Sequence, residues 1–392
     1  MSIASFMDMT SAARVRDILH RLCAFDTTSR DSNLALIAWV EDFLRPLGAD
    51  LVRLPSEDGR KANLWARLGP DLPGGIVLSG HTDVVPVDGQ PWSSDPFSLT
   101  ERDGRWFGRG TTDMKGFIAL ALAHAETLTR LPLRRPVHLA LSYDEEVGCA
   151  GVEPMIAEIA ARGAAPSVVW IGEPTLWAVL SAHKGIRDYE IHITGKAAHS
   201  SDPRLGASAI HEAIGLLSTL RRIAREQEEQ APVSSPFDPS WTTITIGQIN
   251  GGAAPNILAR ECRFVFDVRS VPGHNPDAML KPFFEEAAAV HERLARLGPE
   301  CGLVVNLRAD APAMELRRDS QAELFMRQIT GDNAVRVAAF ATEGGQFQKA
   351  GFASVICGPG SVEQAHQTDE YLAVSEVEKG LEIFSRFIAT LT

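Results

Sequence analysis

The stretch "GIVLSGHTDVVP" (residues 75–86) runs from an apolar segment directly into two polar residues, His81 and Asp83. The apolar part predicts a buried strand. Side chains two residues apart in extended backbone point the same way, so His81 and Asp83 lie side by side where this strand ends. Such a pair is typical of a surface loop. It is also compatible with a metal-bound imidazole whose other ring nitrogen contacts a carboxylate.

Similar apolar runs recur along the chain and alternate with helical patterns. The runs are "NLWARL" (63–68), "VHLALSY" (137–143), "SVVWIG" (167–172) and "ASVICG" (353–358). Helices are expected at about 11–25, 32–46, 116–130 and 151–162. This alternation indicates an α/β catalytic domain with a mainly parallel sheet flanked by helices. Ligands of such domains bind beyond the carboxyl ends of the strands.

Between residues 183 and 310 the apolar runs give way to strands of alternating polarity, such as "IRDYEIHIT" (186–194) and "CRFVFDVRS" (262–270). With helices at about 206–226 and 276–296, the order is the βαββαβ of ferredoxin-like domains. We therefore predict an inserted domain (183–310) that serves as a lid and in dimerisation. The catalytic domain would then consist of 1–182 and 311–392.

The composition excludes several classes of protein. The 392-residue chain carries 38 basic and 50 acidic residues, a net charge of −12, which disfavours nucleic acid or an anionic membrane as partner. Five dispersed cysteines indicate free thiols in a reducing compartment. The first residues, "MSIASFMDMT", lack a signal-peptide pattern, and no apolar stretch approaches the ~20 residues of a membrane span. We predict a cytoplasmic protein that acts on a small molecule.

Polar residues recur wherever a predicted strand ends. They are His81, Asp113 in "GRGTTDMKG", the acids Asp144, Glu145 and Glu146, Glu173 in "IGEPT", and His366 in "EQAHQTDE". Converging acids raise one another's pKa unless a cation neutralises them, so this set suits two divalent metal ions with one bridging carboxylate. One of Glu145 and Glu146 would stay free to take a proton from water, which predicts hydrolysis of a carbonyl compound such as an amide. Each residue also has an ordinary alternative: a helix cap, a solvated turn or an exposed loop.

Five ordered motifs resemble those of the two-metal aminoacyl hydrolase family. They are "SGHTDVVP", "WFGRGTTDMKG", "SYDEEVGCAG", "IGEPT" and "AHQTDEYL", and the resemblance covers nearly the whole chain. The family includes acetylornithine deacetylases, succinyl-diaminopimelate desuccinylases, aminoacylases and glutamate carboxypeptidases.

The resemblance implies two metal ions bridged by Asp113, one also held by His81 and Glu173, the other by Glu146 and His366. It further implies that Glu145 is the general base and that the Asp83 carboxylate orients the His81 ring. Zn²⁺ is the expected metal, and Co²⁺ or Mn²⁺ would also suit these ligands.

The resemblance also implies roles for residues of the inserted domain. His199, in "GKAAHSSDP", resembles a histidine that reaches across a homodimer to the partner's site and stabilises the oxyanion. Asn256 and Arg269 resemble substrate-binding positions, and a guanidinium suits a carboxylate. In the catalytic domain, Gly344 and Gly345 of "TEGGQF" would let the substrate approach the backbone. Without the resemblance, all five would be interpreted as turn or surface residues.

Local features resemble the acetylornithine deacetylase branch of the family most. They are "GRGTTDMKGF", "AHKG" (182–185), "AHSSDP" (198–203) and "TEGGQFQ" (342–348). This resemblance implies hydrolysis of N-acetylornithine to ornithine and acetate, a step of arginine biosynthesis. We hypothesise that Glu343 pairs with the free amine of ornithine, because an acid in the pocket would complement a cationic side chain. The alternatives are a desuccinylase, another N-acyl amino acid amidohydrolase or a carboxypeptidase. A non-catalytic metal-binding scaffold is disfavoured, because Glu145 is present together with all five ligands.

Overall fold

The computed structural model describes residues 10–392, which form two compact units. The main unit extends to Ala182 and also includes 314–337 and 342–392, and the inserted unit comprises His183–Ala313 with Ala338–Ala341. The lid and dimerisation roles expected of 183–310 stay a prediction.

The main unit is built on an eight-stranded sheet with the order β1-β2-β6-β3-β7-β14-β8-β13. The strands are β1 (Asp50–Pro55), β2 (Ala62–Leu68), β3 (Ile76–His81), β6 (Val137–Ser142), β7 (Val168–Ile171), β8 (Leu180–His183), β13 (Arg336–Ala338) and β14 (Ser354–Ile356). The four central strands β6, β3, β7 and β14 are parallel, and β3 and β6 are buried throughout. This centre confirms the predicted parallel sheet. β1, β2 and β8 pair antiparallel at the edges, and a short turn between β1 and β2 permits only that direction.

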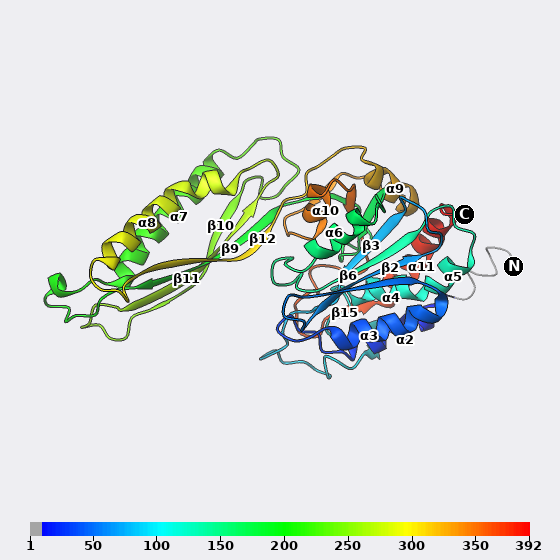
Figure 1. Cartoon of the computed structure of the whole chain (residues 1–392), viewed down its shortest axis with the longest axis horizontal. Coiled ribbons are helices and arrows are strands. Elements are labelled where there is room, and N and C mark those ends of the chain that lie inside the picture. Colours follow the sequence, from blue (N-terminus) through cyan, green and yellow to red (C-terminus); the bar gives the residue numbers. More distant parts are fainter. Residues whose placement is uncertain (1–9) are drawn as a thin grey trace. The chain divides into compact units, whose positions relative to one another are not determined.

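Helices cover both faces of this sheet. They are α2 (Ala12–Cys23), α3 (Leu34–Leu44), α4 (Lys115–Ala123), α5 (Ala125–Arg130), α6 (Glu153–Ala161), α9 (Gln321–Thr330), α10 (Gly344–Lys349) and α11 (Val374–Ala389), with a 3₁₀ turn at Arg45–Leu47. Figure 1 shows α6 and α10 on one face and α2, α4 and α11 on the other. All nine residues of α4 are buried, because it lies between the sheet and the outer helices.

A small three-stranded sheet, β15-β5-β4, joins two loops of the main unit that are distant in sequence. Its strands are β4 (Thr100–Arg102), β5 (Arg105–Phe107) and β15 (Tyr371–Ala373), and Tyr371 pairs with Phe107. The segment after β5 contains Asp113 and the segment before β15 contains His366. The pairing therefore holds these two segments next to each other, which the sequence did not predict.

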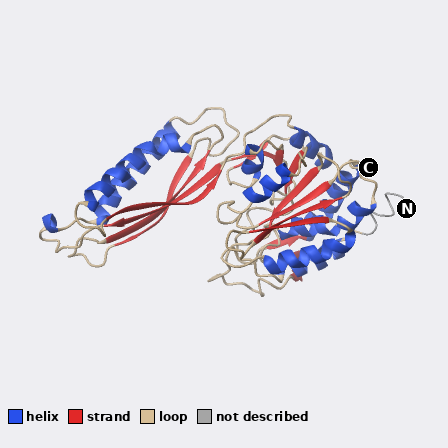
Figure 2. Ribbon diagram, viewed as in Figure 1, coloured by secondary structure: helices blue, strands red, loops and turns tan. Residues whose placement is uncertain are grey.

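The inserted unit has the predicted βαββαβ order. Its elements are β9 (Gly185–Thr194), α7 (Ala209–Glu229), β10 (Thr243–Gly251), β11 (Glu261–Ser270), α8 (Pro276–Ala295) and β12 (Gly302–Ala311), with a 3₁₀ turn at Pro203–Leu205. The strands pair antiparallel in the order β10-β11-β9-β12, which confirms the ferredoxin-like prediction. Both helices lie on one face of the sheet, as Figure 2 shows, and the other face carries ion pairs such as Arg263–Glu190.

Three further expectations concern the whole chain. All five cysteines are buried and free, as predicted. Among residues 10–392, no helix has the length and apolar character that a membrane span requires. The expectation that the N-terminus is not a signal peptide concerns residues 1–9, which lie outside the described part of the chain.

Candidate metal centre

The four central strands bring acidic and imidazole side chains to one edge of the main sheet. His81 is the last residue of β3, Glu145 and Glu146 follow β6, Glu173 follows β7 and His366 follows β14. Because these strands are adjacent and parallel, their carboxyl ends share one edge. Asp113 joins the cluster from the turn before α4.

Asp113 lies between the two histidines. Its Oδ1 is 3.0 Å from Nε2 of His81 and its Oδ2 is 3.2 Å from Nε2 of His366. Each carboxylate oxygen thus faces a different imidazole, which is the arrangement that a bridging ligand needs. Asp113 is not a helix cap, because the N-cap position of α4 is Met114 and it makes no side-chain capping bond.

The remaining acids surround this core. Oε2 of Glu146 lies 3.0 Å from Nε2 of His366, and Oε1 of Glu173 lies 3.8 Å from Nε2 of His81. Two sets of three residues each offer donor atoms within 4.8 Å of one another: His81, Asp113, Glu146 and His81, Glu145, Glu173. The five expected ligands therefore lie together, and Glu145, the expected base, lies within the same reach.

Burial and mutual repulsion dominate the electrostatics of the cluster. Burial raises the pKa of Glu145 to about 8 and that of Glu146 to about 7, and it raises the pKa of Glu173 well above its usual value. Burial also opposes the charge of Asp113, but hydrogen bonds from His366 and His81 hold its pKa below the ordinary value. Four acids, of which Asp113 and Glu173 are buried and Glu145 and Glu146 half-buried, lie beside only two imidazoles and lack compensating positive charge, so the donor set fits divalent cations.

Asp83 differs in part from its expected role. Nδ1 of His81 lies 2.9 Å from the backbone carbonyl of Asp83 and 3.6 Å from its carboxylate. The carboxylate instead accepts the backbone N–H groups of Glu145 and Glu146, both at 3.2 Å, and the Ser29 hydroxyl at 2.8 Å. Asp83 therefore stabilises the loop that carries Glu145 and Glu146, and it also contacts the His81 ring.

Glu343 lies buried beside the cluster, only 2% exposed. Its Oε2 accepts a hydrogen bond from Ser79 at 3.3 Å, and its Oε1 has no partner among the described residues. Burial raises the pKa of Glu343 to about 7. Gly344 and Gly345 begin α10 and are also buried, and a Cβ at Gly344 would approach Met314 Sδ to 2.9 Å. The space beside Gly344 is therefore tight, and a larger residue there would require the Met314 side chain to shift.

Within the inserted unit, His199 and Asn256 lie together and Arg269 lies apart. The segments of His199 and Asn256 form an isolated β-bridge, and Ser200 N–H donates to the Asn256 carbonyl at 2.9 Å. Nδ1 of the exposed His199 contacts the Ser201 hydroxyl at 2.7 Å. Arg269 lies near the other end of β11, paired with Asp267 at 2.8 Å.

Sequence reasoning missed several residues around the cluster. Lys61 pairs with Asp144, and Glu370 binds the backbone of the Asp113 turn. Both Asp144 and Glu370 belong to the quoted motifs. Their partners come from distant segments, so no local pattern reveals the contacts.

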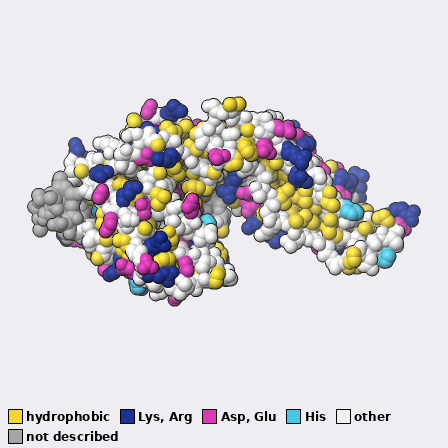
Figure 3. Space-filling model, turned by 180° about the vertical axis from the view of Figure 1, so that it is seen from behind, with side chains coloured by type: hydrophobic (Ala, Val, Ile, Leu, Met, Phe, Trp, Pro, Cys, Tyr) yellow, Lys and Arg dark blue, Asp and Glu magenta, His cyan; other side chains and the backbone are white. Residues whose placement is uncertain are grey.

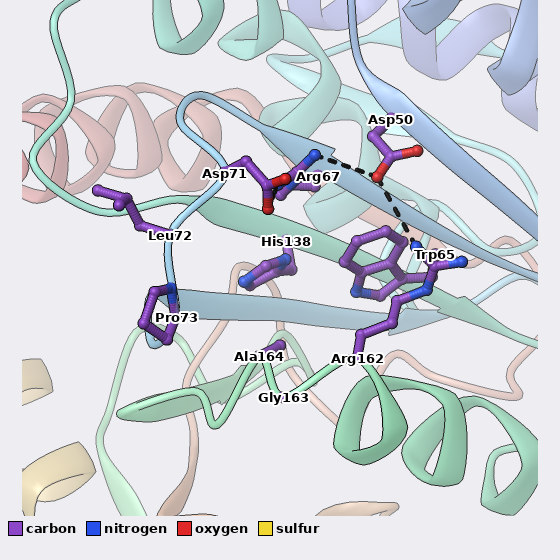
Figure 4. Close-up of a pocket in the computed structure, with 10 residues that line it drawn as sticks. All are labelled: Asp50, Trp65, Arg67, Asp71, Leu72, Pro73, His138, Arg162, Gly163 and Ala164. Atoms are coloured by element: carbon purple, nitrogen blue, oxygen red, sulfur yellow. Dashed lines mark hydrogen bonds and ion pairs between the residues drawn. The ribbon is translucent and has the colours of Figure 1, made fainter.

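A cavity of about 360 Å³ elsewhere in the main unit does not contain this chemistry. Figure 4 shows its lining, which includes Trp65, Arg67, His138 and Arg162. His138 lies at the start of β6, whereas Glu145 and Glu146 follow the end of that strand. Both arginines are already paired with Asp50, so the cavity lacks an uncompensated charge of the kind found in the cluster.

Comparisons with known proteins identify the family of the chain. The sequence pattern of the peptidase family M20/M25/M40 matches residues 77–390. An acetylornithine deacetylase of Proteus mirabilis is 35% identical, over 94% of this chain and 92% of the relative. One of Pasteurella multocida is 34% identical, over 98% of each chain. A crystal structure of an M20 family metallo-carboxypeptidase from Sulfolobus solfataricus shares the fold, with a TM-score of 0.76 at 16% identity, over 94% of this chain and 97% of that one. The chain belongs to the peptidase family M20/M25/M40.

Proposed function

We propose that this protein is a metal-dependent hydrolase that cleaves the amide bond of an N-acyl amino acid, with N-acetylornithine as its preferred substrate. The observation that carries the proposal is the position of Asp113, whose two carboxylate oxygens contact His81 and His366 at 3.0 and 3.2 Å. A carboxylate so placed can bridge two cations.

The residues present fit two divalent ions. His81, Asp113 and Glu173 would hold one ion, and Asp113, Glu146 and His366 the other. Bound ions of this kind supply Lewis acidity and lower the pKa of a water molecule. Nitrogen and carboxylate ligands suit Zn²⁺, which we propose as the native metal, with Co²⁺ or Mn²⁺ as functional substitutes.

Glu145 is proposed to transfer the proton. The water oxygen adds to the acyl carbon while Glu145 accepts its proton. The carbon–nitrogen bond then breaks, and Glu145 returns the proton to the leaving amine, so that the products are a carboxylic acid and an amino acid. The Glu145 Oε1 contact with the Cys149 thiol, at 3.3 Å, leaves its second oxygen available for this task.

The substrate proposal rests on the relatives and on Glu343. Both relatives named above are acetylornithine deacetylases that match nearly the whole chain. The unpartnered Oε1 of Glu343 is a candidate acceptor for the cationic amine of ornithine. Arg269 would bind the carboxylate of the amino acid, and the backbone at Gly344 and Gly345 would contact the substrate.

We also propose that the protein acts as a homodimer through the inserted unit. Hydrophobic side chains gather on the face of this unit seen in Figure 3, and the exposed ones on its edge strands include Ile249 (53%), Val304 (54%) and Leu307 (52%). Arg269 lies eight residues beyond Glu261, a span of ~26 Å at about 3.3 Å per residue. The segments of His199 and Asn256 pair beyond the Glu261 end of β11. One chain therefore does not offer His199 and Arg269 to the same small substrate, and a second copy would supply His199.

A substrate panel on reconstituted enzyme tests the function. Metal is removed by chelation, single metals are added back, and kcat/KM is compared for N-acetylornithine, N-succinyl-diaminopimelate and N-acetylmethionine. The proposal predicts no activity without metal and the highest kcat/KM for N-acetylornithine. Metal-independent hydrolysis would refute the mechanism. A different preferred substrate would refute only the specificity.

A further inference from the structure

Two segments that carry proposed metal ligands meet at one buried carboxylate, that of Glu370. Asp113 ends the turn Gly110–Asp113, and His366 lies four residues before Glu370. The Glu370 side chain is 1% exposed, and burial of a carboxylate is costly unless its oxygens are hydrogen-bonded.

Both oxygens of Glu370 bind the Asp113 turn. Oε1 accepts the backbone N–H of Thr112 at 2.9 Å and that of Asp113 at 3.1 Å. Oε2 accepts the backbone N–H of Gly110 at 3.1 Å. Three amide groups of one short turn therefore point at a single carboxylate, which determines the position of the Asp113 backbone.

A buried arginine extends this contact to the His366 backbone. Nη1 of Arg109, also 1% exposed, donates to Oε2 of Glu370 at 2.7 Å, and Nη2 donates to Oε1 of Gln90 at 2.7 Å. Nε2 of Gln90 in turn donates to the His366 carbonyl at 3.1 Å. His366 has a left-handed backbone (φ 65°), a conformation that a non-glycine residue keeps only where its surroundings hold it.

We propose that Glu370, with Arg109 and Gln90, is a positioning residue that presets the distance between Asp113 and His366 for two cations. Without these contacts, the Asp113 turn and the His366 loop are still joined by the β5–β15 pairing and by the Thr112 hydroxyl, which donates to the Tyr371 carbonyl at 2.5 Å, and metal binding has to order the rest. This inference rests on the proposed metal-dependent function. Outer residues that orient metal ligands typically contribute 10- to 100-fold to metal affinity.

Titration of the metal-free full-length protein with Co²⁺ tests the proposal. Glu370→Gln keeps the shape of the side chain but places an NH₂ group against N–H donors. We expect Co²⁺ affinity by calorimetry to fall about 10- to 100-fold, the visible spectrum of bound Co²⁺ to change, and kcat to fall more than KM rises. The matched control is Glu363→Gln, an exposed acid in the same segment, which should bind Co²⁺ as the parent does.

The outcomes separate this proposal from the function on which it rests. If the parent protein binds no Co²⁺ pair, the proposed function fails. If the parent binds two ions and folded Glu370→Gln binds them equally well, even with a lower melting temperature, the positioning role is overturned. If Glu370→Gln does not fold, Gln90→Ala decides in its place: a smaller loss of Co²⁺ affinity supports the proposal, and unchanged affinity overturns it.

Discussion

Glu145 and Glu146 are adjacent in the chain, but their side chains have different partners. Glu146 contacts His366 at 3.0 Å, whereas Glu145 contacts the Cys149 thiol at 3.3 Å. The sequence predicted that one of these two neighbouring acids would stay free to take a proton from water, and the motif resemblance assigned that role to Glu145. The order of residues alone does not make that assignment. Without knowledge of how the loop packs, either acid could be the general base.

Replacing Glu145 by glutamine should abolish proton transfer while keeping the site intact. We expect kcat to fall about 10²- to 10⁴-fold, the usual contribution of a general base, with metal content unchanged. Steady-state kinetics and metal analysis on one preparation measure both. Glu153→Gln, an exposed acid in the first turn of α6, is the control and should keep full activity. A Glu145→Gln enzyme with more than a tenth of the parent kcat would contradict the assignment.

Asp83→Asn tests whether this carboxylate supports the acidic loop. An amide NH₂ in place of Oδ1 would meet the Glu145 N–H, and in place of Oδ2 it would meet the Glu146 N–H and the Ser29 hydroxyl. We expect the free energy of unfolding to fall by about 1–3 kcal/mol, and kcat to fall with it. Ser29→Ala removes a single bond and should cost less. Unchanged urea unfolding of Asp83→Asn would show that the three bonds contribute nothing.

Among the elements, the central strands and the polar residues that follow each of them were predictable. Both are local patterns: an apolar run marks the strand, and the polar residues come directly after it. The central strands β3, β6, β7 and β14 and the helices between them lie where those patterns indicate. The small sheet of β4, β5 and β15 was not predictable. Its strands have three residues each, and their pairing joins segments more than 260 residues apart.

Packing between helices explains another feature that the sequence left open. His124, at the junction of α4 and α5, stacks on Phe384 of α11 with ring centroids 4.8 Å apart and donates from Nδ1 to the Leu120 carbonyl at 2.8 Å. Burial lowers its pKa from 6.5 to about 4. Between pH 6.5 and about pH 4, this histidine is protonated in the unfolded chain but not in the folded one. The free energy of unfolding therefore decreases as the pH falls through this range.

This histidine should make the main unit sensitive to acid. Through His124 alone, we expect the free energy of unfolding to be about 2 kcal/mol lower at pH 5 than at pH 7. His124→Phe keeps a ring against Phe384 and removes the titrating group, so its unfolding should depend less on pH by that amount. Urea unfolding followed by tryptophan fluorescence at both pH values measures the difference. Equal pH dependence of the two proteins would show that His124 does not carry it.

At the scale of the whole molecule, the chain places His199 and Arg269 at distant ends of the inserted unit. This separation predicts that an active site takes His199 from a second copy. The proposed homodimer does not follow from composition or periodicity. Only the motif resemblance indicated it, because an interface between copies leaves no local pattern in one sequence.

Complementation between two inactive chains tests this sharing. A chain with Glu145→Gln keeps His199, and a chain with His199→Ala keeps Glu145. The two chains are co-expressed with different tags and purified as a mixed dimer. Of the two sites in this dimer, one should contain both Glu145 and His199, so the dimer should show about half of the parent kcat. Each variant alone should be nearly inactive. A mixed dimer without restored activity would place His199 in the site of its own chain.

Asp113 is proposed to bridge two divalent ions in the main unit. Anomalous diffraction at the zinc edge, on crystals of the metal-loaded protein, tests it most directly. We expect two peaks on either side of the Asp113 carboxylate, one beside His81 and one beside His366. Absence of anomalous peaks between these two histidines, with zinc bound elsewhere, would contradict it.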